Sequence, residues 1–152
     1  MNSVAQAGPD RARCRVAPSA LALLESARQG LADAGGQASP GARYVSAHLA
    51  ALRAAAAIVA ARPAPGPPPR RKLPRSVWEL LPRVEPALAE WAAFFAAGAR
   101  KRAAAEAGLP RAVSAREADD LLRDAETFLT LAEEALGVPA QPPLLPLRSV
   151  GL

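Results

Sequence analysis

The stretch from Ser39 to Arg62 constrains the fold more than any other part of the chain. Ser39 is a favourable helix cap, and Pro40 suits the first helical position, where its missing N–H costs nothing. Pro63 stops the helix at the other end. Two helical stripes lie between these signals, an apolar one and one of small residues: Tyr44, His48, Ala51, Leu52, Ala55, Ile58 and Val59, then Ala47, Ala50, Ala54 and Ala57. We expect a long helix with others packed around it.

The composition also favours helices. The chain has 152 residues, a length typical of one domain, and 51% of them are hydrophobic while only 4% are aromatic. Much of the hydrophobic share is alanine, the best helix former, and Ile58 is the only isoleucine. The composition therefore predicts an all-α protein with a core of small side chains.

A first helix is predicted from about Ser19, its N-cap, to Ala34. Its apolar stripe is Leu21, Leu24, Ala27 and Leu31. Gly35 and Gly36 would end it in a left-handed conformation.

The sequence from Ser76 to Glu79 is a capping box that opens a further helix. Pro82 and Pro86 interrupt it, so we expect a short helix to Leu81, a kink, and a main segment from about Arg83 to Ala107. Its predicted apolar face is Val84, Leu88, Trp91, Phe94 and Phe95. Gly98 indicates a close helix contact, and Arg100, Lys101 and Arg102 form a basic cluster near the helix end.

A second capping box, from Ser114 to Glu117, opens the last predicted helix, which ends before Gly137. Its apolar side is Leu121, Leu122, Ala125, Phe128, Leu129, Ala132 and Leu136. Its other side is acidic, with Asp119, Asp120, Asp124, Glu126, Glu133 and Glu134. We interpret these carboxylates as a solvated face and expect no metal, because a di-metal bundle needs several histidines and this chain has one.

These helices predict an antiparallel four-helix bundle made of two helical hairpins. Residues 1–17 are expected to form a disordered basic arm, residues 18–137 the bundle, and residues 138–152 a Pro-rich flexible tail. The Pro-rich linker 63–75 joins the two hairpins.

The net charge of +5 is a weak indication of a nucleic-acid partner. Only Lys72 and Lys101 are lysine, and an arginine-rich, alanine-rich composition is what a GC-rich genome encodes whatever the function. Cys14 is the single cysteine, which excludes an internal disulfide. With no signal-peptide pattern and no apolar run long enough to span a membrane, we expect a cytoplasmic protein without membrane contact.

The motifs of common catalytic sites are missing: a phosphate-binding glycine loop, a Cys/His metal spacing, a Ser-His-Asp arrangement and a dinucleotide fingerprint. We therefore expect no cofactor. The remaining constellation is Arg43-x4-His48. Five residues correspond to about 500° of helical rotation, so the two side chains would point about 140° apart in one continuous helix. They would converge only if Arg43 lay in a distorted first turn or reached across a dimer seam. His48 also lies one turn from Tyr44 and Leu52, which fits a neutral core histidine hydrogen-bonded to a carbonyl or a carboxylate.

The segments L-A-L-L-E-S-A-R-Q-G-L-A-D-A and R-Y-V-S-A-H-L-A-A-L-R-A-A-A-A resemble the HEPN superfamily, and more narrowly its small Ala/Arg-rich actinobacterial proteins. The resemblance covers about Ser19 to Gly137. It implies a helical bundle that commonly dimerises. Many members are metal-independent endoribonucleases with an Arg-x4-6-His motif, and others are binding domains. Under the ribonuclease reading, His48 would be the general base or acid and Arg43 would clamp phosphate. Here Tyr44 follows the arginine where a polar residue is usual, and the motif lies early in the domain.

The expected function is a non-catalytic HEPN-like binding or regulatory module, as a homodimer. A nucleotide or RNA phosphate would bind near Arg43, Tyr44 and His48, with Arg70, Arg71 and Lys72 nearby. Two alternatives stay open. One is the endoribonuclease, and the other is a protein-interaction subunit that uses the Pro-rich linker or the acidic helix face.

Overall fold

The computed structural model describes residues 16–62 and 76–139. The described residues contain helices and no strand, which confirms the all-α prediction. The elements are α2 (Pro18–Gly35), α3 (Pro40–Ala61), α4 (Val77–Val84), the 3-10 turn η1 (Pro86–Leu88), α5 (Ala89–Glu106) and α6 (Ala115–Leu136). The linker 63–75 and nearly all of the predicted basic arm and Pro-rich tail lie outside the described residues.

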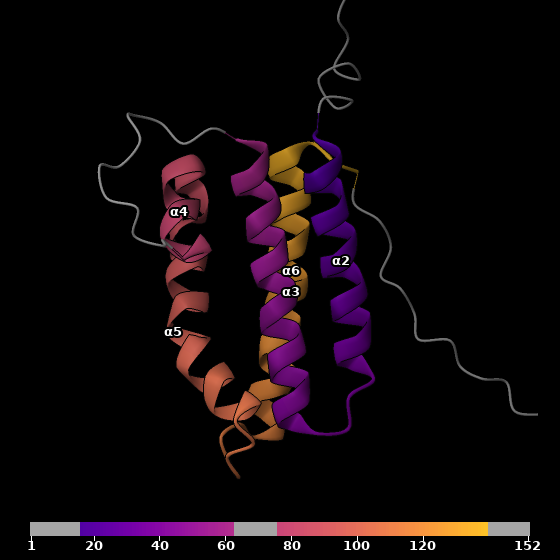
Figure 1. Cartoon of the computed structure of the whole chain (residues 1–152), viewed down its shortest axis with the longest axis vertical. Helices are drawn as coiled ribbons and strands as arrows, with labels where there is room; N and C mark the ends of the chain where they lie inside the picture. Colours follow the sequence, from indigo (N-terminus) through magenta and orange to yellow (C-terminus); the bar gives the residue numbers. More distant parts are fainter. Residues whose placement is uncertain (1–15, 63–75, 140–152) are drawn as a thin grey trace, which may run out of the picture.

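The helices run alternately up and down to form a bundle, in which α4 and α5 together make the third of four segments (Figure 1). α3 stands at the centre, and α2, α4, α5 and α6 all pack against it. The predicted bundle is therefore correct, with one of its four segments broken.

α3 is central because it can be buried on most of its circumference. Ser39 caps it by accepting a hydrogen bond from the Ala42 N–H, as predicted. Both predicted stripes contribute buried residues: Tyr44, Ala47, His48, Ala50, Ala51, Ala54, Ala55, Ala57 and Ile58. Among the described helices, α3 alone has the length and apolar composition to cross a membrane, and half of that apolar window is buried in the bundle. Packing against four neighbours accounts for this composition.

α2 differs from its prediction at both ends. Pro18 occupies the first helical position, so the cap is Ala17 without a side-chain bond, and Ser19 lies inside the helix. Gly36 stays right-handed, with φ −90°, because a tight turn continues there and its N–H donates to Asp33 O. Leu21 is 44% exposed, and the buried stripe instead begins at Ala20.

The third segment breaks at Pro86 rather than at Pro82. Pro82 lies inside α4, and the chain leaves helical geometry at Glu85, with φ −144° and ψ 82°. The ring of Pro86 disfavours the α region for the residue before it, which explains this position. α5 therefore begins at Ala89, not at Arg83.

α6 matches its prediction at both ends. Ser114 and Glu117 form the full capping box, and Gly137 ends the helix with φ 67°. One part of the predicted acidic face is wrong, because Glu133 is only 5% exposed. It follows Leu129 by one helical turn and shares the buried side of α6.

The two sides of α3 are packed by different types of side chain. Toward α2 the contact is made by small residues, and a Cβ at Gly30 would lie 3.3 Å from the Ala50 Cβ. Toward α4 and α5 the core is aromatic. The ring centroid of Phe95 lies 5.1 Å from that of Trp78 and 5.1 Å from that of Phe128. The predicted apolar face of α5 is partly wrong, because Phe94 is 46% exposed.

Candidate functional site

His48 lies in the aromatic half of the core and is fully buried, with an exposed fraction of 0%. Its Nε2 lies 2.8 Å from the Phe95 carbonyl oxygen. Because a carbonyl only accepts, Nε2 must carry the proton and donate. Nδ1 then carries a lone pair, and the Arg102 Nη1 lies 3.4 Å from Nδ1, where it can donate a hydrogen bond. Both ring nitrogens are thus used within the chain by a neutral imidazole.

The surroundings also keep this imidazole neutral. Burial lowers the pKa of His48 below its ordinary value of 6.5, and the nearby charge of Arg102 lowers it further. The bond to the Phe95 carbonyl and the charge of Glu106 raise the pKa, but burial is the largest effect. A neutral ring satisfies the Phe95 carbonyl without a buried charge.

Tyr44 stacks on His48, with ring centroids 6.3 Å apart and planes 16° apart. Its hydroxyl lies 3.5 Å from the Gly98 carbonyl oxygen, and burial raises its pKa. A Cβ at position 98 would lie 2.8 Å from the Tyr44 hydroxyl, so only glycine fits there without a shift. The predicted close helix contact at Gly98 is therefore confirmed.

Arg43 points elsewhere. Its Nη1 donates to the Asp119 Oδ1 at 2.7 Å and its Nη2 donates to the Gln37 carbonyl at 3.1 Å. α3 is one continuous helix through this region, so Arg43 and His48 are rotated apart by about 140°. The described residues include no contact between the two side chains. Arg70, Arg71 and Lys72 lie outside the described residues.

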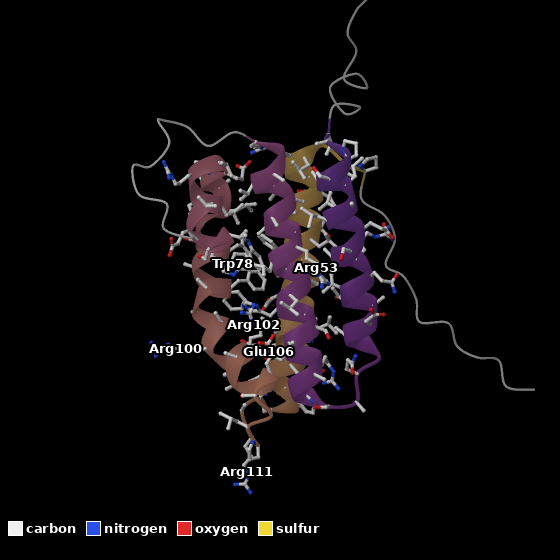
Figure 2. The ribbon with its side chains drawn as sticks, viewed as in Figure 1. Arg53, Trp78, Arg100, Arg102, Glu106 and Arg111 are labelled. Carbon is white, nitrogen blue, oxygen red and sulfur yellow. The ribbon has the colours of Figure 1, made fainter. Side chains whose placement is uncertain are left out.

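Of the predicted site residues, the structure thus brings Tyr44 and His48 together and leaves Arg43 apart. Three residues beside His48 were not predicted as its neighbours. Trp78 meets the imidazole ring edge-on with centroids 6.0 Å apart. Arg102 and Glu106 approach from α5, and Figure 2 shows Arg102 turned toward α3 while Arg100 points away from the bundle. The basic cluster of Arg100, Lys101 and Arg102 could have pointed to a charged neighbour of His48. Helical spacing alone could not show which of these three residues faces the core.

Arg102 is only partly satisfied. Its Nη1 faces His48, and its Nε lies 3.9 Å from the Glu106 Oε1 as an ion pair. Within the described residues, this Nε is buried and has no hydrogen-bond partner. Buried guanidinium nitrogens normally have a hydrogen-bond partner, so the pair with Glu106 leaves this cation incompletely compensated.

An open pocket of about 610 Å³ lies beside Glu106. One wall is the N-terminal part of α3, and the other is the end of α5 with the loop to α6. The polar and charged groups of its lining are Ser39, Ser46, Glu106 and Arg111. Gly108 and Arg111 both have positive φ, 72° and 63°, which shapes the loop around the opening. Figure 2 shows Arg111 at the tip of this loop.

The N-terminus of α3 carries partial positive charge, and Gly41, which lines the pocket, lies in the first turn, whose amides have no intrahelical acceptor. Arg111 adds a cation, while Arg102 offsets the charge of Glu106. In the described part of the chain, no group of three or more His, Cys, Asp or Glu residues could hold a metal ion. The pocket can therefore attract an anion through backbone and guanidinium groups.

The fold and the site together define a class of protein, a helical bundle whose central helix carries an inward-facing histidine. The sequence profile described as HEPN_SAV_6107-like HEPN matches residues 34–133. This is about two-thirds of the chain, and the chain belongs to that HEPN family. The matched range starts at the end of α2 and includes α3, α4, α5 and most of α6. No curated protein and no solved structure matches the chain.

Proposed function

We propose that this HEPN-type protein is a binding module that does not cleave RNA. The burial of His48 carries the proposal. A general acid or base must come within hydrogen-bond reach of the proton that it transfers. The ring of His48 is 0% exposed, and both of its nitrogens already have partners. A phosphodiester could reach it only if α5 moved away from α3.

Arg43 supports the same proposal. A phosphate clamp for His48 would have to converge with it, but the Arg43 guanidinium is 2.7 Å from Asp119 on the face toward α6. The carboxylate of Asp119 would also have to be displaced from Arg43 before a phosphate could bind there.

The proposed ligand is a nucleotide or an RNA phosphate in the pocket between the α3 N-terminus and the α5–α6 loop. Helix N-termini and arginine side chains are common phosphate-binding groups. The volume of about 610 Å³ is in the range of small-molecule sites. We also propose a cytoplasmic location and a homodimer, and the pocket depends on neither.

The test has two parts, and the first is cleavage. The full-length protein is incubated with end-labelled single-stranded RNA in excess chelator, beside His48→Gln and Arg43→Ala. We expect intact RNA in all three reactions. If the native protein produces 2′,3′-cyclic phosphate ends and both variants lose this activity, the proposal is wrong and the chain is a metal-independent endoribonuclease.

The second part is binding. Fluorescence anisotropy with a labelled mononucleotide and a labelled short RNA compares the native protein with Arg111→Glu at the pocket. Arg100→Glu is the matched control, because it makes the same charge change on the outer side of α5 (Figure 2). We expect Arg111→Glu to weaken binding more than Arg100→Glu. Equal weakening by both variants would indicate general attraction to a basic surface, and no binding by the native protein would exclude this ligand.

A further inference from the structure

A second surface feature lies away from the pocket, between α5 and α6. Trp91 and Phe94 of α5, with Glu90 and Asp124, line a shallow groove of about 330 Å³. Phe94 is 46% exposed and Trp91 is partly exposed. We call these four residues the α5–α6 groove.

The groove has a fixed aromatic floor. Trp91 stacks on Phe95 with ring centroids 6.0 Å apart and lies 5.9 Å from Phe128. Phe94 meets Phe95 edge-on at 5.1 Å. Because Phe95 and Phe128 are fully buried, the two outer rings are held in place by the core. The surface is thus preformed, which lowers the entropy cost of binding.

The polar groups of the groove lack partners within the chain. Among the described residues, the indole N–H of Trp91 makes no hydrogen bond, and neither Glu90 nor Asp124 forms an ion pair. Burial raises the pKa of Asp124, and the nearby charge of Asp120 raises it further. A ligand that fits these groups presents apolar rings, an unpaired carbonyl and a cation.

The C-terminal sequence of this chain contains such a ligand. Residues 143–148 read P-L-L-P-L-R, so Pro143 and Pro146 are three apart and Arg148 follows. In a polyproline II helix, residues three apart lie on one face and the backbone carbonyls stay free. Aromatic grooves with a hydrogen-bond donor are the usual receptors of such segments. Arg148 is the only charged residue after Glu134, and its charge is opposite to that of the groove.

The distance also fits. Asp124 to Leu136 covers about 18 Å of α6. Val138 lies near Leu21 and Leu24 of α2, so the tail must also cross α6, whose width is about 10–12 Å. The direct path is then roughly 22 Å. From Pro139 to Arg148, an extended polyproline II segment spans about 28 Å.

We propose that the C-terminal segment Pro142–Arg148 docks in the α5–α6 groove of its own chain. Pro143 and Pro146 pack on Trp91 and Phe94, the Trp91 indole donates to a carbonyl of the segment, and Arg148 pairs with Asp124 or Glu90. This proposal is independent of the phosphate pocket.

The test is a paramagnetic relaxation measurement on the full-length chain. A nitroxide is attached at Ser149→Cys in a Cys14→Ser background, and amide peak intensities are compared with those of the reduced label. We expect loss of intensity for the amides of residues 90–94 and 124. Amides on the outer side of α2, around Glu25, should keep theirs.

Variants on both partners keep the test specific. Arg148→Glu and the pair Pro143→Ala, Pro146→Ala should restore the peaks, and so should Phe94→Ala or Asp124→Asn, which leave the core rings in place. Leu109→Ala is the control, because Leu109 is 58% exposed and lies outside the groove. Unchanged broadening in the groove variants would overturn the proposal.

A mixed sample distinguishes a docked segment of the same chain from a docked segment of a second copy. Chains without ¹⁵N that carry the nitroxide are mixed with ¹⁵N-labelled chains that carry no nitroxide. Broadening of the groove amides in this mixture would show that a second copy supplies the segment, which overturns docking within one chain. Full intensity at the groove in the singly labelled protein would overturn docking altogether.

Discussion

The two sides of α3 are packed by core residues of very different size. On the α2 side, alanine and glycine allow close approach, and a Cβ at Gly30 would lie 3.3 Å from both the Ala50 Cβ and the Arg53 Nη1. On the α4–α5 side, aromatic rings fill the space between the helices. Both surfaces proposed for binding border α5.

Removing an aromatic ring from the core should have the largest effect. Phe95→Ala would leave a cavity among Trp78, Trp91 and Phe128, and we expect a loss of about 3–5 kcal/mol in the free energy of unfolding. Phe94→Ala, one residue away but 46% exposed, should cost less than about 1 kcal/mol. Urea unfolding measures both. Similar losses would mean that the two rings are not divided between core and surface.

Enlarging a residue on the small-residue side should have the next largest effect. Ala50→Leu would push against Gly30, and we expect destabilisation of about 1–3 kcal/mol from overpacking. Ala60→Leu makes the same change at an exposed position of α3 and should be nearly neutral. Thermal unfolding of the two variants tests the closeness of the α2–α3 contact. A neutral Ala50→Leu would show that α2 can move outward freely.

The buried imidazole should make stability depend on pH. The pKa of His48 is lowered in the folded state, so below pH 6.5 the unfolded chain binds a proton that the folded chain does not. The free energy of unfolding should therefore fall as the pH decreases below 6.5, by at most about 1.4 kcal/mol per pH unit. The fall should stop once the pH passes below the pKa of folded His48.

Urea titrations between pH 5 and pH 8 measure this dependence. His48→Gln keeps an amide that can donate to the Phe95 carbonyl, but it does not titrate, so its stability should change less over this range. His48 is the only histidine, which leaves no other imidazole to explain a difference. Identical pH profiles for both proteins would contradict the burial of a neutral ring.

The contact between Gly98 and Tyr44 should give the smallest effect, because two contributions oppose each other. Gly98→Ala gains about 1 kcal/mol of helix propensity but places a Cβ 2.8 Å from the Tyr44 hydroxyl. We expect a net destabilisation of about 1 kcal/mol in the native background. In a Tyr44→Phe background the same change should be neutral or stabilising. A double-mutant cycle gives the coupling, and additivity would mean that the hydroxyl does not limit this contact.

Local signals predicted the helix ends well. The Ser39-Pro40 start of α3, the capping box at Ser114 and the glycine stop at Gly137 all act within one turn, so neighbouring residues suffice to read them. Where two local signals competed, the prediction was wrong. Pro18 displaced Ser19 as the start of α2, and Pro86 rather than Pro82 broke the third segment.

The site was harder to predict because its contacts are distant in sequence. The periodicity placed His48 on a buried stripe and left either a carbonyl or a carboxylate as its partner, but it could not identify Phe95 or Arg102. Which way Leu21 and Glu133 face depends on how α2 and α6 pack, and helical spacing alone is ambiguous by a residue. The rotation of Arg43 away from His48, by contrast, follows from the geometry of a continuous helix alone.

The central place of α3 also has a consequence for how the molecule opens. Each of the other α-helices packs on α3, so we expect the amides in the middle of α3 to exchange with solvent deuterium only when the whole bundle unfolds. α5 buries only Ala92 and Phe95, both in its first half, so its second half adds no buried residue to the core. That half should therefore exchange through local opening, at a much lower free energy. The part of α5 that borders the pocket should then open while the half that carries the groove, and the rest of the bundle, stay closed.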